Sequence, residues 1–97
     1  MAVSQAKISI TLKLTRENYH LWSFQAKTVL KALELWDVVE SAPNGNPDAE
    51  TTKKLNQAMA LLTTSLSEDV MRLIVKCPNV HTVWTTLESH FLKKSLE

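Results

Sequence analysis

The chain contains a single glycine, Gly45, among its 97 residues. Folds rich in β-strands need glycine at many tight turns, because glycine adopts positive φ at little cost. The near absence of glycine therefore favours a helical fold. The length suits one domain and leaves no room for two. A domain of this size buries only about 60–65% of the surface of its unfolded chain, so nearly every large apolar residue is needed for the core.

Apolar residues recur at helical spacing after Thr15, which is a good N-cap residue. The first helix is therefore predicted to begin there, and residues 35–39 continue it as a short helix or a bent last turn. The predicted apolar stripe of this helix consists of Tyr19, Trp22, Ala26, Val29, Leu30 and Leu33.

The later part of the chain predicts three more helices. The loop 41–47, SAPNGNP, precedes Asp48, which caps the second long helix, and Ser67 caps a shorter one. Residues 77–79, Cys-Pro-Asn, end that helix, and the last helix covers about residues 80–94. The three stripes are Leu55, Ala58, Met59, Leu62 and Leu66; Val70, Leu73 and Ile74; and Val80, Val83, Trp84, Leu87 and Phe91.

Residues 7–14, KISITLKL, alternate strictly between apolar and polar residues, as a half-buried strand does. Nothing later in the sequence has the pattern of a partner strand. We expect an extended arm in which Leu12 and Leu14 pack on the chain's own bundle, while the preceding residues are available to pair with the same segment of a second copy. The apolar side of the arm consists of Ile8, Ile10, Leu12 and Leu14.

These patterns together predict an all-α fold. A small bundle of four or five helices covers residues 15–95, and the extended arm covers residues 1–14. The central core positions are predicted to be Tyr19, Trp22, Leu30, Leu62, Trp84, Leu87 and Phe91.

Residues 17–36 hold two of the three tryptophans, the only tyrosine and one of the two phenylalanines. Such a cluster suits a ligand site, a platform for stacking nucleic-acid bases, or one half of a core. Aromatic stripes at helical spacing are usually core, and a stacking platform needs a basic groove beside it. The core interpretation is therefore favoured.

The charge of the chain argues against nucleic-acid binding by this domain alone. The formal net charge is +1, whereas phosphate binding needs a strong basic excess. The charges are nevertheless uneven: residues 1–33 carry five positive and one negative, and residues 34–50 carry five negative and none positive. This asymmetry either holds two parts of one fold together or holds two copies together.

No pattern in the sequence indicates an active site or a cofactor. There is no GxSxG, no glycine-rich phosphate loop and no HExxH. A metal site would need Cys77, His81 and His90, with or without His20 as a further ligand, but the C-x3-H-x8-H spacing of the first three matches no common zinc pattern. We therefore expect no enzyme, no metal and no cofactor.

Several apolar residues lie off the core stripes. In a small bundle they either touch a neighbouring helix or form a second apolar surface that contacts other chains. The candidate residues for a contact between subunits are Ile8, Ile10, Leu21, Phe24, Leu61, Met71 and Val75.

The single cysteine, Cys77, cannot form an internal disulfide, which fits a reducing compartment. No apolar run approaches the roughly 20 residues of a membrane span, and residues 1–14 lack the apolar block of a signal peptide. We expect a cytoplasmic protein without a membrane partner.

The segment LTRENYHLWSFQAKTVLKALELWDVV closely resembles the N-terminal part of the Gag protein of copia-type LTR retrotransposons. The family pattern is a leucine, a short polar gap, N-Y-x-x-W, an amphipathic helix and L-W-x-V. The resemblance continues through AMALLTTSLSEDVMRLIVKC and ends at TVWTTLESHF, so it covers about residues 12–95. The matching positions of the first segment are Leu14, Asn18, Tyr19, Trp22, Leu30, Leu35, Trp36 and Val38.

The resemblance implies the N-terminal lobe of a capsid, which associates with itself through many weak contacts to form the shell of a virus-like particle. The alternative that it implies is a domesticated Gag lobe acting as an adaptor that holds an extended peptide between helices. Two features depart from the family: residues 52–55 lack an early tryptophan, and the sequence stops before a second lobe and a zinc knuckle. We therefore expect a fragment or a truncated copy, with nucleic-acid packaging left to parts of a longer protein.

Overall fold

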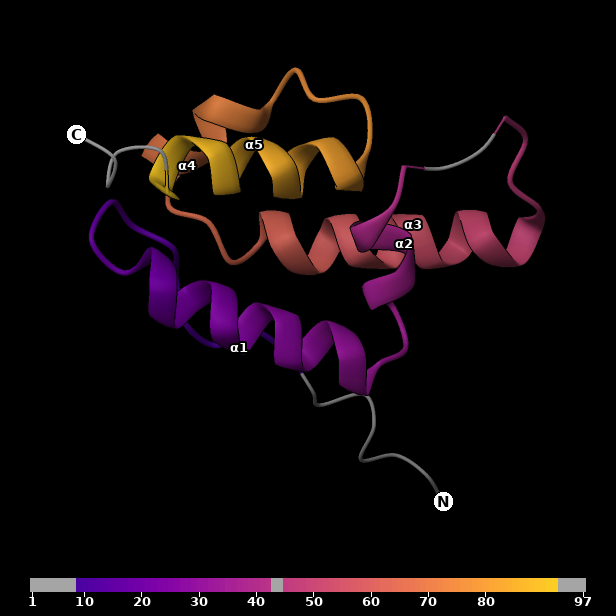
Figure 1. Ribbon diagram of the computed structural model, residues 1–97, viewed down its shortest axis with the longest axis horizontal. Helices are drawn as coiled ribbons and strands as arrows, with labels where there is room; N and C mark the ends of the chain where they lie inside the picture. The colour runs from indigo at the N-terminus through magenta and orange to yellow at the C-terminus, as the bar shows by residue number, and fades with distance from the viewer. Residues whose placement is uncertain (1–8, 43–44, 93–97) are drawn as a thin grey trace.

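The computed structural model describes residues 9–42 and 45–92. Within these residues the chain forms five α-helices, which confirms the predicted all-α fold. The described residues contain no β-strand and one isolated β-bridge. The helices, shown in Figure 1, are α1 (Tyr19–Ala32), α2 (Trp36–Glu40), α3 (Ala49–Thr63), α4 (Glu68–Ile74) and α5 (Val80–Leu92).

The short helix α2 occupies the middle of the bundle. It contacts α1, α3 and α5, while α5 also contacts α3 and α4. In Figure 1, α1 lies along one side of the molecule, α3 crosses the middle, and α4 and α5 lie on the side opposite α1. The first and last helices therefore enclose the core together with α2 and α3.

A continuous row of aromatic rings fills the space between α1, α2 and α5. Trp36 meets Trp84 edge-on at 5.2 Å between ring centroids, and Trp84 stacks on Trp22 at 5.6 Å. Tyr19 lies 6.1 Å from Trp22 and stacks on Phe91 at 5.3 Å. Such ring pairs add to the free energy that area burial alone supplies. The dense aromatic stretch of residues 17–36 thus forms one wall of the core.

Six of the seven residues predicted for the centre of the core lie in it, and the seventh packs against it. Phe91 is partly buried and packs against the cluster, and the other six are buried. The polar end of Trp22 is also satisfied: its indole N–H donates to the Ser65 hydroxyl over 3.1 Å, and that hydroxyl donates to the Leu62 carbonyl over 2.8 Å. Among the described residues, no buried side-chain nitrogen or oxygen lacks a hydrogen-bond partner.

The predicted caps of α3 and α4 are present. Asp48 accepts a hydrogen bond of 2.8 Å from the backbone N–H of Thr51, and this bond holds the pKa of the Asp48 carboxyl below its usual value. Ser67 accepts a longer bond of 3.4 Å from the N–H of Val70. Asn79 caps α5 in the same way: its side-chain oxygen accepts a hydrogen bond of 2.9 Å from the N–H of Thr82.

The predicted start of α1 at Thr15 is wrong by three residues. The N-cap is Asn18, and its side-chain amide bonds backward rather than to the helix: it accepts from the N–H of Thr15 over 2.8 Å and donates to the Lys13 carbonyl over 2.9 Å. These bonds fold residues 15–18 into a turn, so the helical bonding begins only when the N–H of Trp22 meets the Asn18 carbonyl.

The end of α1 is a tight reversal made without glycine. The N–H of Leu35 donates to the Leu30 carbonyl over 2.7 Å, and the N–H of Glu34 donates to the Lys31 carbonyl over 3.0 Å. This pattern is a Schellman motif, in which the residue after the C-cap takes a left-handed conformation. Glu34 occupies that position with a φ of 62°.

The arm has a partner that the sequence did not predict. Leu14 forms a parallel bridge with Leu66, in the turn between α3 and α4, through hydrogen bonds of 2.7 Å and 3.0 Å to the backbone of residues 65 and 67. Leu14 is fully buried, whereas Leu12 is 36% exposed. The expectation that both pack on the bundle is therefore right for Leu14, while Leu12 lies at the surface.

A side chain of α1 fixes the arm at a second point. The Gln25 amide oxygen accepts from the N–H groups of Thr11 and Leu12 over 3.0 and 2.9 Å, and its NH₂ group donates to the Thr11 hydroxyl over 2.9 Å. One amide thus satisfies two adjacent backbone donors of the arm. Pairing of the earlier residues with a second copy stays a prediction, because residues 1–8 lie outside the described part of the chain.

Candidate assembly surfaces

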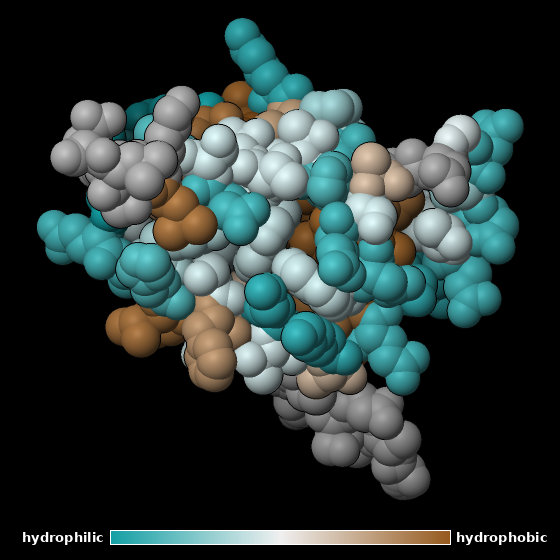
Figure 2. All heavy atoms as spheres, viewed as in Figure 1, coloured by the Kyte–Doolittle hydropathy of each residue, from teal (hydrophilic) through white to brown (hydrophobic). Residues whose placement is uncertain are grey.

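The outer face of α1 carries large apolar side chains that the core does not use. Leu21 is 66% exposed and Phe24 is 75% exposed, whereas Trp22 between them is fully buried. Thr28 follows one turn after Phe24 and donates its hydroxyl to the Phe24 carbonyl over 2.8 Å, so the helix itself satisfies this hydroxyl. We call Leu21, Phe24 and Thr28 the α1 patch. Figure 2 shows apolar atoms gathered over α1 at the edge of the molecule.

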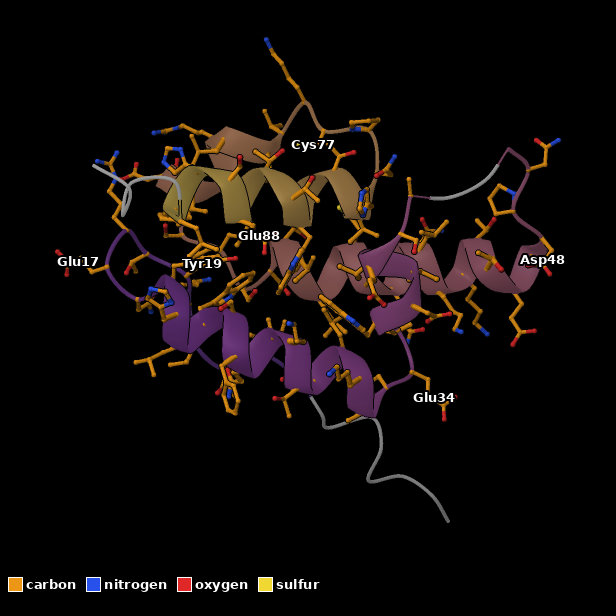
Figure 3. The ribbon with its side chains drawn as sticks, viewed as in Figure 1. Glu17, Tyr19, Glu34, Asp48, Cys77 and Glu88 are labelled. Atoms are coloured by element: carbon orange, nitrogen blue, oxygen red, sulfur yellow. The ribbon has the colours of Figure 1, made fainter. Side chains whose placement is uncertain are left out.

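Charged residues flank the α1 patch at its two ends. Glu17 lies just before α1, and its side chain points away from the bundle in Figure 3. Lys31 lies in the last turn of α1 and is exposed. Between them, Lys27 places its ammonium 5.1 Å from the centre of the Trp36 ring, a cation–π distance. The patch therefore has an acidic end and a basic end.

The charge asymmetry of the sequence does not bind the two halves of this fold together. Of the acidic residues in 34–50, Asp37 alone forms an ion pair among the described residues, and its partner at 3.6 Å is Lys54 of α3. Neither Lys27 nor Lys31 of α1 forms an ion pair within that part of the chain. The basic charges of α1 are thus left at the surface.

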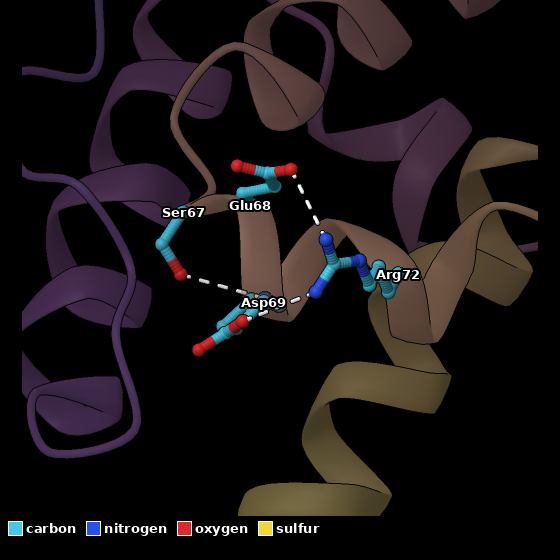
Figure 4. Close-up of polar contacts among 5 residues, drawn as sticks. Ser67, Glu68, Asp69 and Arg72 are labelled. Atoms are coloured by element: carbon cyan, nitrogen blue, oxygen red, sulfur yellow. Dashed lines mark hydrogen bonds and ion pairs between the residues drawn. The ribbon is translucent and has the colours of Figure 1, made fainter.

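A smaller apolar surface lies on α4. Met71 is 37% exposed and Val75, its C-cap residue one turn later, is 71% exposed. Beside them Arg72 pairs with Glu68 at 3.1 Å and with Asp69 at 3.4 Å, as Figure 4 shows. All three charged side chains are mostly exposed, so these pairs contribute little to stability.

The remaining candidate residues for a subunit contact lie in other places. Ile10 and Leu61 are partly buried and pack against the core of their own chain. Ile8 lies outside the described residues. The seven candidates therefore do not form one surface: the largest exposed apolar area among them belongs to Leu21 and Phe24.

A groove that the sequence did not indicate runs between the start of α1, α4 and α5. It has a volume of about 290 Å³ and is lined by Arg16, Asp69, Val70, Leu73, His90 and Phe91. The prediction that Leu73 points inward is wrong: it is 41% exposed, because it lies at the edge of the stripe formed by Val70 and Ile74. The edge position of Leu73 is the one signal in the sequence for this groove. The position of Arg16 beside this groove depends on tertiary structure, which the sequence pattern does not show.

Tyr19 is the titratable group that the fold perturbs most clearly. Burial raises its pKa to about 12, and the negative charge of Glu88 on α5 acts in the same direction. Figure 3 shows the two residues on the facing helices. A buried tyrosine beside a carboxylate keeps its proton at neutral pH, which suits a packing role.

The histidines and the cysteine occupy separate places. His81 Nδ1 lies 2.9 Å from the Val39 carbonyl and links α5 to α2, and Cys77 Sγ lies 3.6 Å from the Thr86 hydroxyl. Within residues 9–42 and 45–92, no three His, Cys, Asp or Glu side chains gather where they would hold a metal ion. In the same residues, no helix has the length and apolar character needed to span a membrane.

Residues 26–97, about three quarters of the chain, match the family model described as the gag-polypeptide of LTR copia-type. The chain belongs to this family. Comparison of this Gag chain with curated proteins and with solved structures finds no match. The match includes the last part of α1 and all of α2 to α5, and it begins after Trp22, whose ring stacks on Trp84 of α5.

Proposed function

We propose that this Gag chain is a structural, non-enzymatic capsid-type unit that associates with copies of itself. The observation that carries the proposal is the α1 patch, whose two large apolar side chains are more than half exposed on a chain of this family. Exposed apolar groups that share one helical face are typical of contacts between chains. The unit would act in the cytoplasm as part of the shell of a virus-like particle.

The size of the patch supports assembly through several weak contacts rather than one strong contact. A stable interface buries about 800 Å² on each partner, which two side chains and their neighbours do not supply. The Met71 and Val75 surface on α4 offers a second place of contact. Repetition of modest contacts over a shell gives a stable assembly although each contact dissociates readily.

The test is a Phe24→Glu substitution, with molar mass measured by sedimentation equilibrium across a concentration series. Because the Phe24 side chain is 75% exposed, we expect an unchanged melting temperature and a self-association constant at least about tenfold weaker. Asn56→Glu on α3 is the matched control, since it adds the same charge at another exposed helical position. An unaltered association constant in Phe24→Glu would refute the proposed surface.

The groove favours a second candidate function, a peptide-binding adaptor. Its lining combines apolar side chains, among them Leu73 and Phe91, with the polar groups of Arg16, His90 and Asp69. These groups suit an extended peptide with an apolar side chain next to a carboxylate. Leu73→Lys should abolish binding of such a peptide in a calorimetric titration, while Met71→Lys, on the other flank of α4, should leave binding unchanged. The adaptor function is rejected if the unmodified chain binds no such peptide.

A further inference from the structure

We infer that the α1 patch binds the same patch of a second copy in an antiparallel, two-fold arrangement centred on Phe24. This inference rests on the proposed function, because it specifies the geometry of one self-association contact. A two-fold contact uses one surface on both partners, so each residue before the centre meets the residue equally far beyond it. The partner in this proposal is a second copy of this chain.

The spacing of the patch fits such a contact. Leu21 precedes Phe24 by three residues and Thr28 follows it by four, so all three lie along one side of α1. In the antiparallel arrangement Phe24 meets the same residue of the second copy, and Leu21 lies opposite Lys27 of that copy, next to Thr28. The Thr28 hydroxyl is bonded to its own helix backbone, so the contact buries no unpaired hydroxyl.

The charges at the two ends select the antiparallel direction. Glu17 and Lys31 each lie seven residues from Phe24: Glu17 is in the turn that precedes α1, and Lys31 lies about 10 Å further along the helix. An antiparallel pair places each Glu17 beside Lys31 of the other copy, so the pair contains two such contacts between opposite charges. A parallel pair would place like charges together at both ends, and it would also align the two helix dipoles unfavourably.

Both end residues are available for this pairing. Glu17 and Lys31 are exposed, and neither forms an ion pair in the part of the chain that the structure describes. In Figure 3 the Glu17 side chain extends outward from the end of α1. Among the residues that the structure describes, no helix covers the α1 patch, since Leu21 and Phe24 remain mostly exposed.

The test uses two charge-reversal variants, Glu17→Lys and Lys31→Glu, first separately and then mixed. Each variant alone places like charges together at both ends of the antiparallel pair, so we expect its self-association to be about tenfold weaker. An equal mixture restores opposite charges at both ends, and its association should return to within about twofold of the unmodified protein. Sedimentation equilibrium up to about 1 mM detects contacts of this strength.

The outcomes separate this inference from the proposed function. Suppose that Phe24→Glu weakens self-association, but that mixing Glu17→Lys with Lys31→Glu does not restore the association of the unmodified protein. The α1 patch is then a contact surface, and the antiparallel geometry is wrong. If Glu17→Lys associates more tightly with the unmodified protein than either does with itself, the helices pair in parallel. If the unmodified protein stays monomeric over the whole concentration range, both proposals fail.

Discussion

At the scale of single residues, Trp22 joins α1 to the later part of the chain. It is fully buried, lies against Tyr19 and Trp84, and donates a hydrogen bond to Ser65. We expect Trp22→Ala to lower the free energy of unfolding by about 3–5 kcal/mol, because the substitution leaves a cavity and removes these contacts. Urea unfolding followed by far-ultraviolet circular dichroism measures the loss. The exposed Leu21→Ala is the control and should stay within about 0.5 kcal/mol.

The raised pKa of Tyr19 predicts that the stability of the fold depends on pH in the alkaline range. Its pKa is about 12 in the folded chain, against an ordinary value of 10. Between these values the unfolded chain loses the tyrosine proton and the folded chain keeps it, so the free energy of unfolding falls as the pH rises from 10 to 12. Below pH 10 this contribution is fully present.

Tyr19→Phe should remove the part of the fall in the free energy of unfolding that comes from this tyrosine. Urea midpoints measured from pH 10 to 12 would reveal the difference. Tyr19 is the only tyrosine in the chain, so ultraviolet difference absorbance follows its ionisation without interference. A native-state ionisation near pH 10, or identical pH profiles for the two proteins, would contradict the assignment.

At the scale of elements, the reversal between α1 and α2 contains a strained position. Glu34 has a φ of 62°, which costs an ordinary residue about 1–2 kcal/mol and costs glycine almost nothing. We expect Glu34→Gly to raise the free energy of unfolding by about 0.5–1 kcal/mol, after allowing for the greater freedom of glycine in the unfolded chain. Glu34→Ala removes the same charge but keeps the strain, so it should give no such gain. Thermal unfolding of both variants tests the difference.

The elements show which features the sequence could and could not predict. Helical spacing predicted the apolar faces of α1 and α5, because those faces have wide stripes centred on tryptophans. The true start of α1 was missed since it depends on an amide of Asn18 that bonds backward. The bridge of Leu14 to Leu66 was missed because a pairing of one residue leaves no alternating pattern.

The candidate surfaces divide in the same way. Leu21 and Phe24 were predicted as off-stripe residues, and periodicity alone places them opposite the core. Leu61 was also off the stripe, yet it is partly buried because a neighbouring element covers its flank. The groove beside Leu73 joins residues from three segments, and local spacing carries no information about such a meeting.

At the scale of the whole molecule, charge and stability are nearly independent. The ion pairs among the described residues join side chains that are more than half exposed, apart from the partly exposed Lys54, and surface pairs contribute about 0–1 kcal/mol each. We therefore expect the melting temperature to change little between low and high sodium chloride. Self-association should weaken over the same range, because the contact proposed for α1 uses opposite charges. A large loss of melting temperature in salt would mean that ion pairs hold the fold together.

The aromatic row also gives the molecule an optical signature. The indole rings of Trp36, Trp84 and Trp22 follow one another along the row, with ring centroids 5.2 Å apart in the first pair and 5.6 Å apart in the second. Rings fixed this closely in an asymmetric environment give strong circular dichroism in the near ultraviolet, and that signal vanishes when side-chain packing is lost even if the helices persist. All the tryptophans of the chain belong to this row. Near-ultraviolet dichroism and tryptophan emission will therefore record the closure of α5 onto α1 and α2, with no label added to the protein.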